Sequence, residues 1–333
     1  MNIIVPMAGM GKRMRPHTLT IPKPLIPVAG KPIVQHLVED IAAMCDEKID
    51  EVAFVIGRFG LETEKQLLQI AENIGAKGRI FYQDEALGTA HAVLCAADCL
   101  TGNLIVAFAD TIFKADFKLN AEKDGVIWVN KVDNPKQFGV VKIDADNHIC
   151  EFVEKPQEFV SDLAIIGIYY FKDGANLKKE IDYLIDNDIK DKGEYQLTNA
   201  LENMKNKGLK FEPGTVIEWL DCGNKNATVH TNQRVLEIKP ESAVIHPDAK
   251  ISNSVIIPPV CIAAGVHVVN SVVGPHVSLG AGCHVEQSLL SNSIIQTNSK
   301  IISAHISNSM IGSHAVCEGK ALDLSLSDYS TLS

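Results

Sequence analysis

The stretch IIVPMAGMGKRMRPHTLTIPKPLIPV, residues 3–28, decides how the N-terminal part of this chain folds. It begins with a short apolar run, residues 3–6, that is typical of a buried strand. The run leads into a loop that holds two glycines and four cations, namely Gly9, Gly11, Lys12, Arg13, Arg15 and Lys23. Glycines let backbone N–H groups approach phosphate oxygens, and fixed cations neutralise the charge on them. We therefore predict a strand that opens into a phosphate-binding loop.

Two widespread phosphate motifs do not fit this loop. A Walker A motif needs four residues between its first glycine and a Gly-Lys-Ser/Thr group, and the dinucleotide fingerprint needs a third glycine where Met14 stands. The segment instead resembles the signature of the sugar-1-phosphate nucleotidyltransferases, which is a G-x-G-x-R-x-x-P-x-T loop followed by P-K-x-x-x-P-V. Residues 9–18 match the first part of this signature, and residues 22–28 match the second.

The composition limits the classes of function that the chain could have. It has 333 residues, a net charge of −10 and 46% hydrophobic residues, as expected of a globular protein. The acidic balance argues against binding to nucleic acid or to an anionic membrane. The eight cysteines are scattered without a CxxC pair, and the N-terminal apolar run is too short for a signal peptide. We therefore expect a cytoplasmic protein with neither of these two partners.

Strand-like and helix-like runs alternate through the first 240 residues. The expected strands cover residues 2–6, 52–56, 79–82, 104–108 and 126–129, and the expected helices cover residues 32–44, 61–74, 89–97 and 224–237. This alternation favours an α/β fold, a Rossmann-like, mainly parallel mixed sheet with helices on both faces. Such folds bind ligands at the carboxyl ends of their strands, which is where the glycine loop and Asp110 fall.

The pattern changes at about Glu241. Aliphatic residues then recur every five or six positions, at Ile245, Ile251, Ile256, Ile262, Val268, Val273, Leu279 and Val285. Similar four-residue units begin at residues 253, 270 and 287, and two more begin at residues 292 and 308. Three short strands per coil, each with one inward aliphatic residue, give this spacing. The pattern resembles the left-handed parallel β-helix of hexapeptide-repeat proteins. We expect a catalytic domain over 1–240, this β-helix over 241–318 and a C-terminal tail over 319–333.

The family resemblance implies a particular reaction. An oxygen of a sugar-1-phosphate attacks the α-phosphorus of a nucleoside triphosphate (NTP), and pyrophosphate leaves. Because both reactants are polyanions, the protein must supply cations and bind Mg²⁺. By resemblance, Asp110 and Asp221 hold the metal, Arg13 binds the β- and γ-phosphates, and Lys23 contacts the transferring α-phosphate. We expect Arg13, Lys23 and Asp110 to be the catalytic residues, and the alternative role for either aspartate is to cap a turn.

Further residues follow from the same resemblance. The nucleotide-binding set is Ala8, Gly9, Gly11, Lys12, Arg13, Gln83, Gly88 and Thr89, and the sugar-phosphate set is Gly139, Glu154, Lys155 and Gly167. An amide such as that of Gln83 donates to a ring carbonyl and accepts from a ring N–H, a pair that thymine, uracil and guanine all present. The chain departs from common family residues at Ala8, at Lys12 and at Asn199, which stands where aspartate is usual.

The sequence leaves the substrates open. We favour glucose-1-phosphate with dTTP or UTP, and a mannose-1-phosphate guanylyltransferase is the alternative. Six histidines in the repeat region raise a second class, a bifunctional enzyme that also acylates the sugar. A third class is a non-catalytic regulatory subunit that binds a nucleotide sugar. The flat faces and open end of a β-helix also predict a homo-oligomer.

Overall fold

The computed structural model describes residues 1–116 and 118–320, so most of the predicted tail over 319–333 lies outside the described residues. The described part divides into two compact units. The first contains Met1–Ile26 and Pro32–Gly223, and the second contains Pro27–Lys31 and the residues from Asn224 onward. This division places residues 224–240 and 27–31 with the β-helix, whereas the sequence places them in the 1–240 domain. None of the helices in the described part is long and apolar enough to cross a membrane.

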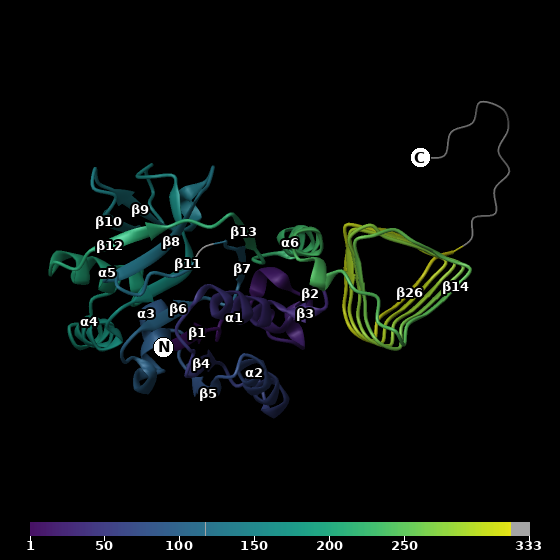
Figure 1. Cartoon of the computed structure of the whole chain (residues 1–333), viewed down its shortest axis with the longest axis horizontal. Helices are drawn as coiled ribbons and strands as arrows, with labels where there is room; N and C mark the ends of the chain where they lie inside the picture. Colours follow the sequence, from purple (N-terminus) through teal and green to yellow (C-terminus); the bar gives the residue numbers. More distant parts are fainter. Residues whose placement is uncertain (117, 321–333) are drawn as a thin grey trace. The chain divides into compact units, whose positions relative to one another are not determined.

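The first unit is built around a mixed sheet (Figure 1), for which the described residues supply nine strands. The order β10-β9-β11-β6-β1-β4-β5 runs across the sheet, and β8 pairs with both β11 and β12. These strands are β1 (Asn2–Pro6), β4 (Glu51–Ile56), β5 (Lys77–Tyr82), β6 (Leu104–Ala107), β8 (Gly125–Lys131), β9 (Gly139–Ile143), β10 (Ile149–Glu154), β11 (Leu163–Phe171) and β12 (Phe211–Gly214). All of the strands expected from the sequence form.

The strands β6, β1, β4 and β5 are parallel neighbours, so their carboxyl ends meet at one edge of the sheet. Strand β11 runs antiparallel to β6, β8 and β9, and this makes the sheet mixed. The predicted Rossmann-like α/β class is therefore confirmed. The parallel edge carries the glycine loop after β1 and Gln83 after β5, as a ligand-binding edge should.

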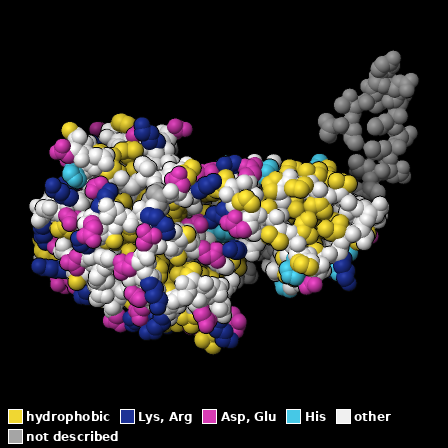
Figure 2. Space-filling model, in the orientation of Figure 1, with side chains coloured by type: hydrophobic (Ala, Val, Ile, Leu, Met, Phe, Trp, Pro, Cys, Tyr) yellow, Lys and Arg dark blue, Asp and Glu magenta, His cyan; other side chains and the backbone are white. Residues whose placement is uncertain are grey.

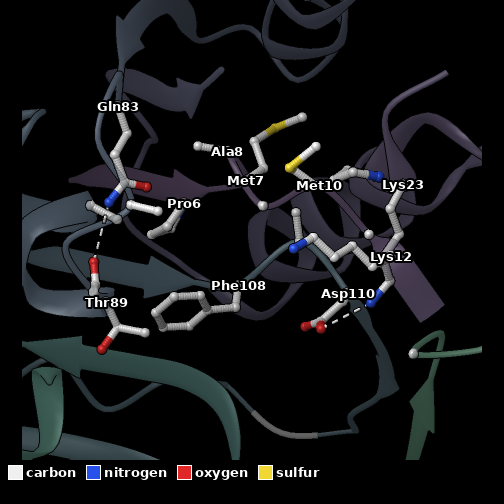
Figure 3. Close-up of a pocket in the computed structure, with 18 of the residues that line it drawn as sticks. Pro6, Met7, Ala8, Met10, Lys12, Lys23, Gln83, Thr89, Phe108 and Asp110 are labelled. Carbon is white, nitrogen blue, oxygen red and sulfur yellow. Dashed lines mark hydrogen bonds and ion pairs between the residues drawn. The ribbon is translucent and has the colours of Figure 1, made fainter. Parts of the chain in front are cut away.

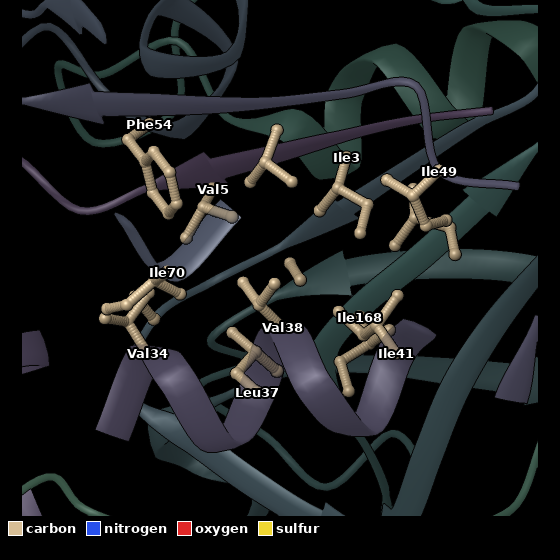
Figure 4. Packing of buried hydrophobic residues seen from close by; sticks show 14 of the residues in the cluster. Ile3, Val5, Val34, Leu37, Val38, Ile41, Ile49, Phe54, Ile70 and Ile168 are labelled. Carbon is tan, nitrogen blue, oxygen red and sulfur yellow. The ribbon is translucent and has the colours of Figure 1, made fainter. Parts of the chain in front are cut away.

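Helices cover both faces of the sheet, which the alternation within β1 explains. Ile3 and Val5 point into one core with α1 (Ile33–Met44) and α2 (Leu61–Asn73), as Figure 4 shows. Ile4 points into the other core. The helices of that second face are α3 (Thr89–Leu94), α4 (Gly174–Asp186) and α5 (Leu197–Asn206). A strand that is buried on both faces reads as a continuous apolar run, and the sequence over residues 3–6 has this property.

Two details of the helices differ from expectation. The helix expected over residues 89–97 ends at Leu94, and a short 3-10 turn over Ala97–Cys99 follows it. Ala96, between them, has φ −100° and ψ 35°, which are not helical values. The helices α4 and α5 were not among those expected, although Asp173 caps α4 by accepting the N–H groups of Ala175 and Asn176.

The second unit contains the β-helix, which is left-handed and parallel as predicted. Its described strands form three sheets, seen as the walls of the triangular coils in Figure 1. The first sheet is β14 (Lys250–Ser252), β17 (His267–Val269), β20 (His284–Glu286), β23 (Lys300–Ile302) and β26 (Val316–Glu318). The second is β15 (Val255–Ile256), β18 (Val272–Val273), β21 (Leu289–Ser291) and β24 (His305–Ser307). The third is β16 (Val260–Ile262), β19 (Val277–Leu279), β22 (Ser293–Ile295) and β25 (Met310–Ile311).

The aliphatic repeat fills the inside of the coils. Ile262, Val268, Val273, Leu279 and Val285 are buried as expected. Ile245 and Ile251 are instead 44% and 37% exposed, because they belong to the first coil and another coil covers them on one side only. The β-helix thus begins with an apolar open end.

The repeated Asn-Ser units form the corners of the coils. Asn253 and Asn270 adopt φ values of 44° and 51°, a left-handed conformation that asparagine tolerates better than most residues. The side chain of Asn253 donates to that of Asn270 at 2.7 Å, and the hydroxyl of Ser254 accepts the N–H of Ser271 in the next coil at 3.0 Å. The units at 253, 270 and 287 precede the strands of the second sheet, and those at 292 and 308 precede strands of the third sheet, so they form two corners.

The helix α6 (Lys225–Ile238) packs in the second unit through a buried polar residue, Asn232. Its carbonyl oxygen accepts the backbone N–H of Ala29 at 2.9 Å and the hydroxyl of Ser278 at 2.7 Å. Its amide nitrogen donates to the carbonyl of His276 at 3.2 Å. A single side chain therefore joins residues 27–31, the helix and the β-helix.

Candidate active site

A pocket opens at the carboxyl ends of the parallel strands in the first unit (Figure 3). It gathers the predicted nucleotide-binding and catalytic residues, which come from the glycine loop, from the segment after β5 and from the end of β6. Those that line it are Ala8, Gly9, Gly11, Lys12, Arg13, Lys23, Gln83, Gly88, Thr89 and Asp110. Met7, Met10 and Phe108 supply apolar wall, and the sequence did not point to them.

The glycine loop is folded back on Lys23. Gly11 has φ 57°, and a Cβ atom there would lie 2.9 Å from Cβ of Lys23 and 3.1 Å from Cγ2 of Thr18. The hydroxyl of Thr18 donates to the carbonyl of Gly11 at 2.9 Å, which closes the loop. Only glycine fits both the conformation and the space, so the loop depends on this residue.

Lys23 and Asp110 form the charged centre of the pocket. Lys23 begins a 3-10 turn over Lys23–Leu25 and is 8% exposed. Its Nζ lies 3.0 Å from Oδ2 of Asp110, whose side chain is 46% exposed. A buried lysine is stable only beside a counter-charge, and here the predicted metal ligand provides it.

The small sheet of the first unit places Asp221 beside Asp110. Strand β13 (Glu218–Asp221) pairs antiparallel with β7 (Thr111–Lys114), and Asp221 lies opposite Thr111. The N–H of Cys222 donates to the carbonyl of Asp110 at 3.0 Å. Burial, and then the charge of Asp110, raise the pKa of Asp221, while Lys23 and Arg13 act in the opposite direction. The two aspartates and the two cations thus share one electrostatic site.

This aspartate pair fits a divalent metal ion. Two carboxylates that repel each other would both be stabilised by a cation between them. Mg²⁺ takes one or two carboxylates and completes its shell with phosphate oxygens and water. The described residues contain no cluster of three or more His, Cys, Asp or Glu side chains that could hold a metal by themselves. A metal here would need ligands from the substrate.

The segment after β5 holds the amide of Gln83 firmly. Its Nε2 donates to the carbonyl of Gly88 at 3.2 Å and lies 3.2 Å from Nδ1 of His91. Gly88 has φ 118°, and a Cβ atom there would lie 2.7 Å from the backbone nitrogen of Tyr195. The N–H of Tyr195 donates to the carbonyl of Leu87 at 2.8 Å, so this turn packs against the segment that precedes α5.

Thr89 lines the pocket, yet its hydroxyl is engaged within the protein. It donates to Oε1 of Gln196 at 3.1 Å and accepts the N–H of Leu197 at 2.9 Å. The segment over 193–199 therefore supports the turn that holds Gln83. Glu194 of this segment lines the pocket as well. The family resemblance pointed to Asn199 of this segment, although not to these contacts.

The predicted sugar-phosphate residues form a second group around β9, β10 and β11. Glu154 lies opposite Gly139 in the strand register, and a Cβ atom on Gly139 would lie 3.0 Å from Oε2 of Glu154. The hydroxyl of Thr198 donates to the same oxygen at 3.4 Å. Nζ of Lys155 lies 3.5 Å from Oε1 of Glu154. Gly167 has φ 84° and accepts the N–H of Phe108 at 2.9 Å, which links this group to the end of β6.

Tyr169 of β11 packs against Phe108, with the two ring centroids 6.1 Å apart. It is 6% exposed, and burial, followed by the charges of Glu154 and Asp110, raises its pKa. Phe108 lines the pocket, so its contact with Tyr169 connects β11, which carries Gly167, to the end of β6.

Comparisons with known proteins show the family to which this chain belongs. Residues 2–238 match the family model described as Nucleotidyl transferase. The chain is 31% identical to the bifunctional protein GlmU of Methanococcus maripaludis strain C5 over 262 residues, which cover 77% of this chain and 60% of that protein. It is 31% identical to the low-salt glycan biosynthesis nucleotidyltransferase Agl11 of Haloferax volcanii over 240 residues, 69% of this chain and 65% of that protein. The chain thus spans less than two thirds of the length of these relatives.

A solved structure is also similar, that of a putative glucose-1-phosphate thymidylyltransferase from Bacillus anthracis in complex with a sucrose. The TM-score is 0.60 and the sequence identity is 26%, and the match covers 72% of this chain and 96% of that chain.

Proposed function

Because this chain belongs to the nucleotidyl transferase family, we propose that it transfers a nucleoside monophosphate from an NTP to a sugar-1-phosphate. A phosphate oxygen of the sugar-1-phosphate forms a bond to the α-phosphorus. The bond from the α-phosphorus to the oxygen that bridges to the β-phosphorus breaks, and pyrophosphate leaves with that electron pair. The products are a nucleoside-diphosphate sugar and pyrophosphate.

The observation that carries this proposal is the Lys23–Asp110 pair below the glycine loop. The attacking phosphate oxygen is already ionised, so the protein needs no strong base. Lys23 neutralises charge on the α-phosphoryl group, and Arg13 neutralises the leaving pyrophosphate. Backbone N–H groups of Gly9 and Gly11 hold the phosphates. Glu154 accepts hydrogen bonds from sugar hydroxyls, and Lys155 binds the phosphate of the sugar.

We propose Mg²⁺ as the cofactor, with Asp110 and Asp221 as its protein ligands. When bound, it would offset phosphate charge and help to align the two substrates. Lys23 would then leave Asp110 and turn its charge to the α-phosphate. The raised pKa of Asp221 supports this proposal, because a bound cation would stabilise the ionised carboxylate.

We propose glucose-1-phosphate with dTTP or UTP as the substrates, and the name of the Bacillus anthracis structure supports this choice. Mannose-1-phosphate with GTP is the alternative. The test is to incubate the full chain with Mg²⁺, each nucleotide and each sugar phosphate, and to identify the nucleotide sugar by mass spectrometry. Formation of a nucleotide sugar in one mixture supports the proposal. If no mixture forms one, the proposal is contradicted.

Two other classes stay as alternatives. A regulatory subunit would have no need of the complete set of Arg13, Lys23, Asp110 and Asp221, so we rank it lower. The name "bifunctional" of the GlmU relative belongs to that protein, and the chain covers 60% of it. Acyl transfer by this chain would show as release of free thiol from acetyl-CoA. The cytoplasmic location also stays a prediction.

We propose that the β-helix joins copies of this chain. Figure 2 shows hydrophobic side chains gathered on the face of the β-helix that is in view. Val255, Val272 and Leu289 lie in register along one sheet, and Val255 and Leu289 are 56% and 41% exposed. The same apolar stripe on a second copy would match it across a two-fold axis. Light scattering should show an oligomer that Leu289→Asp dissociates and that Lys300→Asp, on another sheet, leaves intact. A monomeric wild-type protein would contradict this.

A further inference from the structure

The amide of Gln83 has one orientation, because two acceptors hold its nitrogen. The carbonyl oxygen of Gly88 lies 3.2 Å from Nε2, and only a donor fits next to a carbonyl oxygen. The same Nε2 lies 3.2 Å from Nδ1 of His91. Since the amide nitrogen carries the hydrogens, Nδ1 must offer its lone pair, and the proton of the neutral imidazole sits on Nε2. Both hydrogens of the Gln83 amide are thereby used.

The carbonyl oxygen of Gln83 is the atom that remains for a ligand. Gln83 lines the pocket, whereas His91, on α3, holds the amide from outside the lining of that pocket. Figure 3 shows a dashed line from the nitrogen of Gln83, which marks its hydrogen bond to the carbonyl of Gly88, and the oxygen of Gln83 directed away from that line. Among the described residues, no donor reaches this oxygen. Gln83 therefore acts as an acceptor toward the pocket, because both of its N–H groups already donate to atoms of the protein.

We propose that His91 is a positioning residue that locks the carbonyl oxygen of Gln83 toward the nucleotide, so that the site selects a base with a ring N–H. This inference rests on the proposed function and on the predicted place of Gln83 in the nucleotide-binding set. Uracil, thymine and guanine carry a ring N–H on their pairing edge. Cytosine and adenine carry a lone pair at the equivalent ring nitrogen, which would face the Gln83 oxygen. The substrate class is then UTP, dTTP or GTP, and CTP and ATP are rejected.

The best probes are pairs of nucleotides that differ at this edge, namely UTP against CTP and GTP against ATP. Binding to the full chain is measured by calorimetry with Mg²⁺ present, so the readout does not depend on turnover. In the wild-type protein we expect the preferred member of at least one pair to bind about tenfold more tightly or better. In the other member, a ring lone pair would face the oxygen of Gln83, and neither acceptor would have a donor.

Two variants of His91 separate positioning from simple packing. His91→Leu removes one of the two acceptors, so that Gly88 alone holds the amide less firmly, and the ratio within the pair should fall about fivefold or more. His91→Asn places a carbonyl oxygen near the position of Nδ1, and the ratio should stay within about twofold of wild type. A residue that only supports the fold would weaken all four nucleotides alike. Melting curves of both variants check that they are folded.

Several results would overturn the inference. These are equal binding within both pairs in the wild-type protein, a ratio that His91→Leu leaves unchanged, and loss of the ratio in folded His91→Asn. Pyrophosphate release is measured separately on the same samples. If the binding ratios behave as expected and no sugar-1-phosphate yields pyrophosphate, the inference stands and the proposed transfer reaction is wrong. If release occurs without base preference, the transfer stands and the role of His91 is wrong.

Discussion

Nζ of Lys23 lies 3.0 Å from Oδ2 of Asp110, so the predicted phosphate ligand and the predicted metal ligand neutralise each other in the protein alone. The side chain of Lys23 is 9% exposed, whereas that of Asp110 is 46% exposed, so substrates reach the pair from the side of the aspartate. This arrangement keeps a buried cation in place until phosphate and metal arrive. It also means that neither residue is replaceable by a neutral one without leaving the other unpaired.

We therefore expect Lys23→Ala and Asp110→Asn each to lower kcat by about two orders of magnitude or more, as loss of an electrostatic stabiliser does. Pyrophosphate release under saturating substrates is the measurement. Lys23→Arg serves as a matched control for charge, and we expect it to remain impaired because a planar guanidinium does not replace a compact ammonium. A near wild-type rate in either main variant would remove that residue from the mechanism.

We expect the ionised carboxylate of Asp221 to lower the stability of the fold although turnover requires it. Burial, and then the charge of Asp110, hold its pKa above the ordinary carboxyl value of 3.8. The ionised form is therefore disfavoured in the folded protein, and this cost is present at neutral pH and vanishes as the pH falls below that ordinary value. We expect Asp221→Asn to raise the Tm of the metal-free protein at pH 7, to raise it less at pH 4, and to abolish most turnover. A lower Tm at pH 7 would show that Asp221 stabilises the fold.

Substitution of Gly88 tests the turn that holds Gln83, because the atoms next to Gly88 are backbone atoms that do not move aside easily. Its φ of 118° and the backbone of Tyr195 leave no room for a Cβ atom. We expect Gly88→Ala to weaken UTP or dTTP binding about tenfold or more, since the turn that holds Gln83 must move. Gly75 has φ 75° with open space around it, so Gly75→Ala should cost about 1–2 kcal/mol of stability and leave nucleotide binding unchanged. Equal binding losses in the two variants would contradict the model of the turn.

Asn232 should be important for the second unit. Replacing it with leucine keeps the volume but removes the acceptor of the N–H of Ala29 and of the hydroxyl of Ser278. We expect Asn232→Leu to lower the free energy of unfolding by about 2–4 kcal/mol, measured by denaturant titration. The exposed Asn226 on the same helix is the control, and Asn226→Leu should change it by less than about 0.5 kcal/mol. Similar effects for both would mean that the buried network contributes little.

The sequence was sufficient where a local pattern has one physical solution. The apolar run before Gly9 predicts a buried strand, and β1 is buried on both faces. The spacing of the Asn-Ser units predicts the repeated coils, although not that their asparagines form the corners, where φ is left-handed.

Other features depend on contacts between distant segments, which a local pattern does not contain. His91 reads as an ordinary helix residue, and its role appears only when Gln83 lies beside it. Thr89 reads as a ligand-binding hydroxyl, yet Gln196 and Leu197 engage it from over a hundred residues away. Asn232 gave no signal either, since its partners come from residues 27–31 and from the β-helix.

The central claim is that this pocket transfers a nucleotide to a sugar phosphate, and one measurement tests it most directly. Pyrophosphate release with Mg²⁺ should be measured over a grid of nucleoside triphosphates and sugar-1-phosphates, with Lys23→Ala run beside the wild-type protein. We predict rapid release for one strongly preferred pair and its loss in the variant. Tight nucleotide binding without release for any pair would contradict the claim and favour a regulatory role.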